Sequence, residues 1–220
     1  MIFMSARKML LLNIIVLIIL VGGGFTGYYF YNRSISYITT DNAMIDGQQV
    51  TIAAPATGKL VSWNGREGKT FHQDEKMGTL LVTSDKGAPV KMDIKAPADG
   101  TIVKSSAVQN TYVSAGSSLA QSYDMDALFV TANVEETDIH DVKTGQEADV
   151  YVDAYPNTKV SGTVSSIEKA AASTFSLMPA DRSSGNYTKE TQVIPVKIEL
   201  DSYGGLELVP GMNVTVRIHK

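Results

Sequence analysis

The densest group of side chains that could do chemistry lies in one short stretch of the chain. Glu135, Glu136, Asp138 and Asp141 supply four carboxylates, and His140 adds an imidazole among them. Carboxylate oxygens are the ligands that hard divalent cations prefer, so a divalent-ion site is one interpretation. The spacing fits no established loop pattern, however, and acids near the start of a helix interact favourably with its dipole. We therefore favour a solvated short helix over residues 135–142 and expect no metal.

Other routes to catalysis lack their usual residues. The chain has no Cys, which excludes disulfides, thiol nucleophiles and cysteine-bound metals, and its only histidines are His72, His140 and His219. No G-x-S-x-G nucleophile elbow occurs. The formal net charge of −4 leaves no basic excess to neutralise phosphates, which argues against nucleic acid as a partner. We expect a protein that is not an enzyme and has no cofactor.

The N-terminal segment predicts a membrane anchor. No charged side chain occurs between Lys8 and Arg33, and the run at 10–21 is almost entirely Leu, Ile and Val. About 20 apolar residues suffice for a helix to cross the hydrocarbon core. The aromatic group at 28–31 is typical of the far membrane interface, and Arg7 and Lys8 before the span favour a cytoplasmic N-terminus. We expect a single-pass protein of the cell (inner) membrane with its C-terminal domains extracytoplasmic. A cleaved signal peptide is the alternative, but no A-x-A pattern follows the apolar run.

The remainder of the chain reads as β-structure with an internal repeat. Alternation of apolar and polar residues predicts strands at 150–152, 194–200 and 214–218. Residues 52–61 and 94–103 share six of ten positions at an offset of 42, including an A-P-x-x-G pattern in each copy. Later glycines and leucines repeat with a spacing that differs by a few residues. We interpret the repeat as two quasi-symmetric halves packed face to face, and predict structural turns at Pro55, Gly58, Pro97, Gly100, Gly145 and Gly211 because Pro fixes φ and Gly permits positive φ.

These features resemble a known family. Paired A-P-x-x-G half-motifs are characteristic of lipoyl- and biotinyl-type domains and of the same domain in membrane fusion proteins, the periplasmic adaptors of the haemolysin-secretion type. The run at 40–47 resembles the T-D-(D/N)-A opening of EmrA-type multidrug adaptors. Residues 134–146 and 185–200 resemble stretches of their β-barrel domain, and Pro210-Gly211-Met212 resembles their closing strand.

The resemblance implies a mainly β protein with an N-terminal transmembrane helix, a lipoyl-like barrel-sandwich hybrid and a small β-barrel. The expected divisions are a cytoplasmic tail over 1–8, an anchor over 9–32, a linker over 33–44, the hybrid domain over 45–122 and the β-barrel domain over 123–220.

One feature departs from the family pattern. Such adaptors usually carry a long α-helical hairpin between the two half-motifs, whereas here only residues 82–93 lie there. Helical legs built from so few residues would be about 9 Å long at 1.5 Å per residue. We therefore expect a tight hairpin tip at 85–89 and do not expect docking to an outer-membrane channel.

The resemblance implies a non-catalytic adaptor that forms homo-oligomers on the exoplasmic side of a transporter and directs the export of drug-like substrates. A major-facilitator partner is favoured, with an ATP-binding-cassette permease as the second choice. The alternative is an exoplasmic ligand-binding module or a lipoyl- or biotinyl-type carrier, since Asp85-Lys86-Gly87 resembles the lysine-bearing tip of lipoyl domains. The segment 170–185 is expected to be a long loop in the barrel domain, either a partner or substrate contact or a disordered segment.

Overall fold

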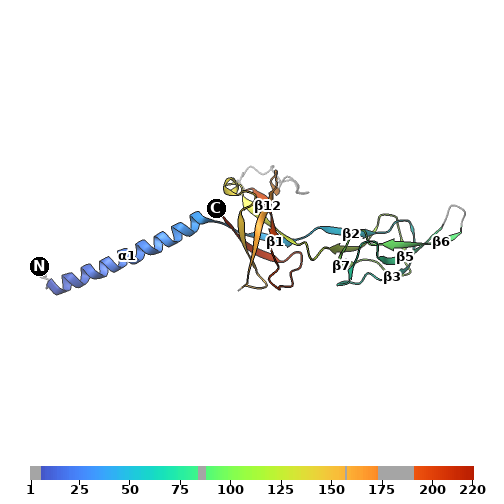
Figure 1. Cartoon of the computed structure of the whole chain (residues 1–220), viewed down its shortest axis with the longest axis horizontal. Helices are drawn as coiled ribbons and strands as arrows, with labels where there is room; N and C mark the ends of the chain where they lie inside the picture. The colour runs from blue at the N-terminus through green and yellow to red at the C-terminus, as the bar shows by residue number, and fades with distance from the viewer. Residues whose placement is uncertain (1–5, 84–87, 157, 173–190) are drawn as a thin grey trace, which may run out of the picture.

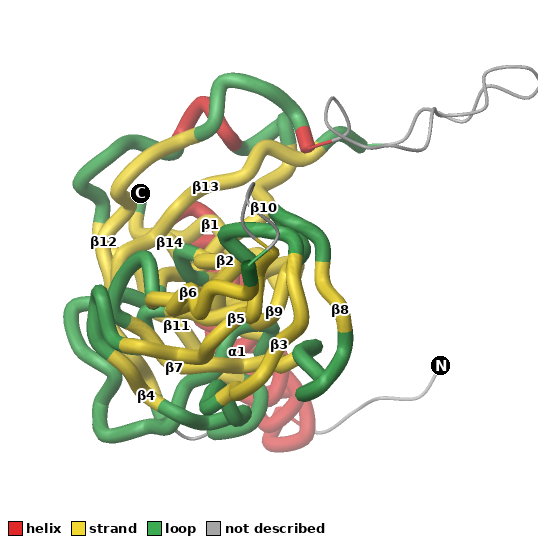
Figure 2. Tube along the Cα trace, turned by 90° about the vertical axis from the view of Figure 1, so that its right-hand side faces the viewer, coloured by secondary structure: helices red, strands yellow, loops and turns green. Residues whose placement is uncertain are grey.

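The chain is extended, with a helix and two β domains arranged in sequence along one axis (Figure 1). The computed structural model describes residues 6–83, 88–156, 158–172 and 191–220, and within the first helix it describes side chains over 13–28. Helix α1 (Ala6–Ser36) leads into the first strand of a β-barrel at 37–46. The chain then forms a β-sandwich from strands within 49–123, and strands within 129–219 complete the barrel. Seen along the long axis, the sandwich lies in front of the barrel and α1 lies behind both (Figure 2).

Helix α1 contacts little of the rest of the described chain. All its side chains from residue 13 to residue 28 are exposed, including Leu17, Leu20 and Phe25. Within the described residues, no helix meets the combined length and apolarity of a membrane span. The anchor expected over residues 9–32 therefore stays a prediction.

Six antiparallel strands close the barrel in the order β1-β10-β13-β12-β11-β14. Their bounds are Tyr37–Asp46 (β1), Phe129–Glu135 (β10), Val193–Leu200 (β13), Lys159–Ile167 (β12), Glu147–Val152 (β11) and Asn213–His219 (β14). Alternate residues point inward, so Val130, Ala132 and Val134 of β10 are buried between exposed or half-buried neighbours. The strands expected around 150, 194 and 214 are confirmed, and all of them belong to this barrel.

The expected linker is wrong over most of its length. Residues 37–46 form β1, which pairs with β10 on one side and β14 on the other, so the barrel begins directly after α1. The expected hybrid domain therefore starts too early at residue 45, because Ile45 is buried in the barrel core. Period-2 alternation is hard to see in β1 because its pairing register shifts between Thr40 and Ala43.

The second domain is a sandwich of two four-stranded sheets. Its strands are β2 (Gln49–Ala53), β3 (Gly58–Trp63), β4 (Thr70–Phe71), β5 (Lys76–Thr83), β6 (Pro89–Lys95), β7 (Gly100–Ser105), β8 (Tyr112–Val113) and β9 (Ser118–Tyr123). One sheet has the order β2-β9-β7-β4 and the other β6-β5-β3-β8. Each sheet thus combines two strands from each half of the repeat. The halves interleave and do not form one layer each.

The repeat extends through the whole sandwich at one offset. Ile52 pairs with Ala120 and Ile94 pairs with Gly78, and adding 42 to 52 and to 78 gives 94 and 120. The same relation connects Leu60↔Leu80 with Ile102↔Ser122. The changed spacing that we expected in the later part of the repeat is therefore wrong, since Gly78 corresponds to Ala120 and not to Gly116. The core between the sheets is separate from that of the barrel and includes Phe71, Met77 and Trp63.

Strands β5 and β6 form a plain β-hairpin at the end of the sandwich that is remote from the barrel (Figure 1). Their pairing continues to Thr83↔Pro89, so only residues 84–88 connect them. Five residues cannot hold two helical legs, which confirms that this chain lacks the long hairpin. The expected tip residue Lys86 lies outside the described residues.

Candidate functional site

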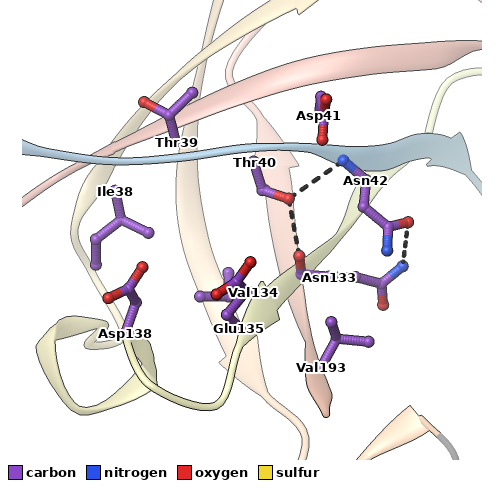
Figure 3. Close-up of a pocket in the computed structure, with 10 residues that line it drawn as sticks. All are labelled: Ile38, Thr39, Thr40, Asp41, Asn42, Asn133, Val134, Glu135, Asp138 and Val193. Carbon is purple, nitrogen blue, oxygen red and sulfur yellow. Dashed lines mark hydrogen bonds between the residues drawn. The ribbon is translucent and has the colours of Figure 1, made fainter. Parts of the chain in front are cut away.

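The T-D-N-A segment lies where two neighbouring strands of the barrel separate (Figure 3). Strand β1 pairs with β10 only from Ala43 onward, while its first half pairs with β14 alone. The Thr40 hydroxyl donates a 2.8 Å hydrogen bond to the carbonyl oxygen of Asn133 on β10. The Asn133 side-chain amide in turn donates to Oδ1 of Asn42 at 3.1 Å. Side chains thus replace the missing strand ladder, which gives this segment a structural role.

The separation leaves a small cleft in the barrel wall of about 220 Å³. Polar groups of Asp41, Glu135 and Asp138 line it beside the apolar side chains of Ile38 and Val193 (Figure 3). Within the residues that the structure describes, no three His, Asp or Glu side chains are placed to hold a metal ion.

The acidic stretch beyond β10 is only briefly helical. A 3₁₀ turn, η1 (Ile139–Asp141), replaces the helix expected over 135–142. Asp141 forms an ion pair with Lys220 at 2.8 Å, and Nε2 of His140 lies 3.2 Å from Oδ1 of the same carboxylate. The hydrogen bond from Lys220 lowers the pKa of the Asp141 carboxyl below its usual value. Asp141 is thus paired with Lys220, the residue that follows β14.

Backbone hydrogen bonds join the P-G-M segment, in the connection before β14, to β1. Gly211 has φ +91° and its N–H donates to the carbonyl oxygen of Ile45 at 2.8 Å. The Ile45 N–H donates to the carbonyl oxygen of Met212, also at 2.8 Å. Gly145, with φ +88°, makes a comparable turn before β11, and its N–H donates to Val164. Both positions require the left-handed conformation that glycine adopts without strain.

The turn glycines of the repeat are needed for a different reason from the one expected. Pro55 and Pro97 lie in the bends before β3 and β7, and Gly58 and Gly100 are the first residues of those strands. Neither glycine has a positive φ. A Cβ at Gly58 would lie 2.6 Å from the carbonyl oxygen of Leu81, and one at Gly100 would lie 3.0 Å from that of Tyr123. Close backbone packing therefore disfavours a side chain at Gly58, where a strand would have to move, and leaves little room for one at Gly100.

Of the remaining histidines, His219 lies in a charged group on the outside of the barrel. Its Nε2 lies 3.3 Å from Oδ2 of Asp149. Nζ of Lys159 lies 3.1 Å from Oδ1 of the same carboxylate. The His219 ring packs edge-on against Tyr37, at 4.8 Å between ring centroids. Burial acts to raise the pKa of the Asp149 carboxyl, but the charge and hydrogen bond of Lys159, together with the nearby imidazole of His219, outweigh it and the pKa is lowered. His72 is exposed and lies 3.6 Å from Asp99.

The sequence did not reveal a pocket of about 730 Å³ at the junction of the two domains. Residues from β1, β7 and β9 and the segment 209–211 line it. These segments are far apart in the chain, so only the folded arrangement brings them together. Most of the loop expected over 170–185 lies outside the described residues.

Comparison with known proteins identifies both β domains. Residues 48–124 match the family model of the YhbJ barrel-sandwich hybrid domain, and residues 128–218 match that of the YknX-like β-barrel domain. YhbJ of Bacillus subtilis, named as a component of an efflux system, is 42% identical over 84% of this chain and 81% of its own length. The colistin resistance protein EmrA of Acinetobacter baumannii is 36% identical over 57% of this chain. The match spans only 36% of that EmrA, so this chain is much shorter than such relatives.

Solved structures show the same fold at low sequence identity. ZneB of Cupriavidus metallidurans has a TM-score of 0.59 at 18% identity and covers 84% of this chain and 97% of its own. The periplasmic adaptor protein EmrA has a TM-score of 0.55 at 13% identity and covers 84% of this chain and 99% of its own. Relatives of this kind are non-catalytic adaptors of efflux systems, so the chain is not an enzyme. The chain belongs to the membrane fusion protein family of efflux adaptors, in a short form without the α-helical hairpin.

Proposed function

We propose that this chain is a membrane-anchored adaptor subunit of an efflux transporter. It would form homo-oligomers on the exoplasmic side of a partner pump and direct the export of drug-like substrates. The exposed apolar surface of α1 is the observation that supports a membrane anchor. Its side chains from residue 13 to residue 28 are all exposed, and those at 14–21 are all Ile, Leu or Val. A helix that is apolar on all sides is stable when lipid or protein surrounds it.

The connection between α1 and the barrel supports a barrel that is held in a fixed position close to the membrane. Strand β1 follows α1 without an intervening loop, and the N–H of Lys220 donates to the carbonyl oxygen of Ser36 at 3.0 Å. The last barrel strand is therefore tied to the C-terminal end of α1. An adaptor built in this way would hold its barrel beside the exit of the partner and extend its sandwich away from the membrane.

The similarity to EmrA supports a major-facilitator pump as the partner, with an ATP-binding-cassette permease as the second choice. The colistin resistance EmrA and the fatty acid resistance protein FarA of Neisseria gonorrhoeae are both named for resistance to amphipathic compounds. We extend this class of substrate to the present chain. The short β5–β6 hairpin supports a system that ends at this membrane and does not reach an outer-membrane channel.

The absence of Cys from the sequence makes the topology directly testable. We would introduce Ser5→Cys in the tail or Lys91→Cys on exposed strand β6, and treat intact cells with a membrane-impermeant maleimide. The anchor predicts labelling of the Lys91→Cys chain on intact cells, and of the Ser5→Cys chain only after lysis. Labelling in the opposite order would overturn the orientation. Loss of residue 5 from the mature chain would show the cleaved signal peptide instead.

A further inference from the structure

The junction pocket has the size and lining of a small-molecule site. Its volume of about 730 Å³ lies inside the range of roughly 300–1,000 Å³ that is usual for such sites, which often form between domains. Met44 and Val103 line it from β1 and β7, and Val209 lines it from the connection before β14. Their side chains are 43%, 37% and 45% exposed, so apolar surface faces this space in the absence of an occupant.

The two copies of the repeat can be compared to see which part of the pocket wall the barrel supplies. Val61 is the residue that corresponds to Val103, and both lie at register shifts where their strands bulge. Val61 is 40% exposed and lies on the other sheet of the sandwich, which contains β3. The sandwich therefore presents similar apolar residues at both sites. At Val103, Met44 and the 209–211 segment of the barrel line the pocket together with the sandwich.

The two charged side chains in the lining differ in their availability. Oδ1 of Asp46 accepts a hydrogen bond from the N–H of Gly47 at 2.8 Å, and Oδ2 lies 3.4 Å from the hydroxyl of Thr131. Lys104 is exposed, and its ammonium forms no ion pair or hydrogen bond within the described part of the chain. An occupant with a negative group would gain a charge-assisted hydrogen bond there.

We infer that the junction pocket binds a single-chain anionic amphiphile, with its hydrocarbon chain against Met44, Val103 and Val209 and its carboxylate beside Lys104. Release of water from this mostly apolar wall favours an occupant with a hydrocarbon chain. Burial of the hydrocarbon chain supplies most of the binding free energy, while the lysine at the rim selects the sign of the head group. This inference deepens the proposed function, since it names a class of molecule that the adaptor would receive.

Methionine methyl NMR gives a direct test. The full-length chain, labelled with ¹³C-methyl methionine and placed in lipid nanodiscs, is titrated with dodecanoate below its micellar concentration. The signals of Met44 and Met125, which both line the pocket, are expected to shift, while those of Met77 in the sandwich core and Met92 on β6 stay unchanged. Shifts of all four signals together, or of none, would overturn the proposed site.

Two pairs of variants test which residues of the pocket contact the occupant. Val103→Trp should abolish the shifts by filling the pocket, whereas Val61→Trp at the corresponding bulge should leave them intact. Lys104→Glu should weaken binding about two- to fivefold, as expected for loss of an exposed charge pair, and Lys91→Glu on the remote strand β6 should not. Equal effects within either pair would contradict the inference.

The head group is tested with dodecyltrimethylammonium, which has the same hydrocarbon chain and the opposite charge. It should bind more weakly than dodecanoate, and binding as strong as that of dodecanoate would overturn the anionic preference. These measurements need no pump. Failure of dodecanoate binding is therefore distinguishable from failure of the proposed pump association, which is measured by co-purification from membranes.

Discussion

Asp74 and Gly116, which lie 42 residues apart, share a left-handed backbone conformation and the same hydrogen bond. Their φ angles are +63° and +79°. The N–H of Asp74 donates to the carbonyl oxygen of Ala96 at 2.9 Å, and that of Gly116 donates to the carbonyl oxygen of Ala54 at 2.8 Å. Because the two acceptors are also 42 residues apart, the fold repeats the turn in full although the residue types differ.

This pair predicts unequal effects of substitution. Gly116→Ala should lower the free energy of unfolding by about 1 kcal/mol, because an L-residue is strained in this conformation and no atom lies within 4 Å to cause a further clash. Asp74→Gly should change it by less than about 0.5 kcal/mol, since relief of strain opposes the greater freedom of the unfolded chain. Urea unfolding followed by fluorescence of Trp63, the sole Trp and 8% exposed in the sandwich core, measures both values. Equal losses in the two variants would contradict the assignment.

Gly58→Ala is expected to cost more than Gly116→Ala. The added Cβ would lie 2.6 Å from the carbonyl oxygen of Leu81, so a backbone strand must move. Overpacking of this kind typically costs about 1–3 kcal/mol, and we expect the upper part of that range. Gly22→Ala in α1, where no atom lies within 4 Å, is the matched control and should leave the Trp63 transition unchanged. A wild-type transition in the Gly58→Ala chain would show that the strands approach less closely than described.

The hydroxyl of Thr40 is predicted to hold β1 to β10. Thr40→Val should destabilise the barrel by about 1 kcal/mol, the usual net contribution of one hydrogen bond, because the carbonyl oxygen of Asn133 loses its donor. The N–H of Asn42, which donates to Thr40 Oγ1 at 3.2 Å, should exchange faster with solvent. Thr39→Val on the adjacent exposed position is the control. Hydrogen exchange is measured residue by residue. Equal protection of the Asn42 N–H in both variants would contradict this role.

Asp149 is expected to contribute acid-sensitive stability. Its pKa is lowered in the folded chain, since Lys159 and His219 outweigh the opposing effect of burial. The contribution is therefore present above the unfolded pKa, about 3.9, and is lost as the pH falls through the lower folded value. Between pH 5 and pH 3 the melting temperature of wild type should fall more steeply than that of Asp149→Asn. Parallel curves for the two proteins would refute this assignment, and Asp153→Asn on the next turn should follow wild type.

The sequence predicted those features that depend on local pattern. The repeat at 52–61 and 94–103 indicated the sandwich, and alternation located the strands of residues 193–200 and 213–219. Strand β1 was missed because the irregular pairing between Thr40 and Ala43 interrupts its alternation. The later part of the repeat was misaligned because its corresponding positions differ in residue type: Gly78 matches Ala120, and Leu80 matches Ser122.

The candidate site could not be predicted in the same way. The reason for glycine at position 58 is a contact with Leu81, twenty-three residues further along the chain, and no local pattern encodes it. The junction pocket requires Met44, Lys104 and Val209 to meet across two domains. Individually these residues are ordinary surface side chains. Their significance follows from the packing of the barrel against the sandwich.

The proposal that the chain serves a pump is tested most directly by its partners in the membrane. Tagged full-length chain is purified from membranes in mild detergent, beside a matched chain that begins at Tyr37 and so lacks α1. Mass spectrometry identifies the co-purifying proteins and measures the intact mass of the chain. We predict a polytopic transporter with the full-length chain only, and an unmodified intact mass. Recovery of no transporter, together with an added lipoyl or biotinyl mass, would contradict the adaptor and indicate a carrier domain.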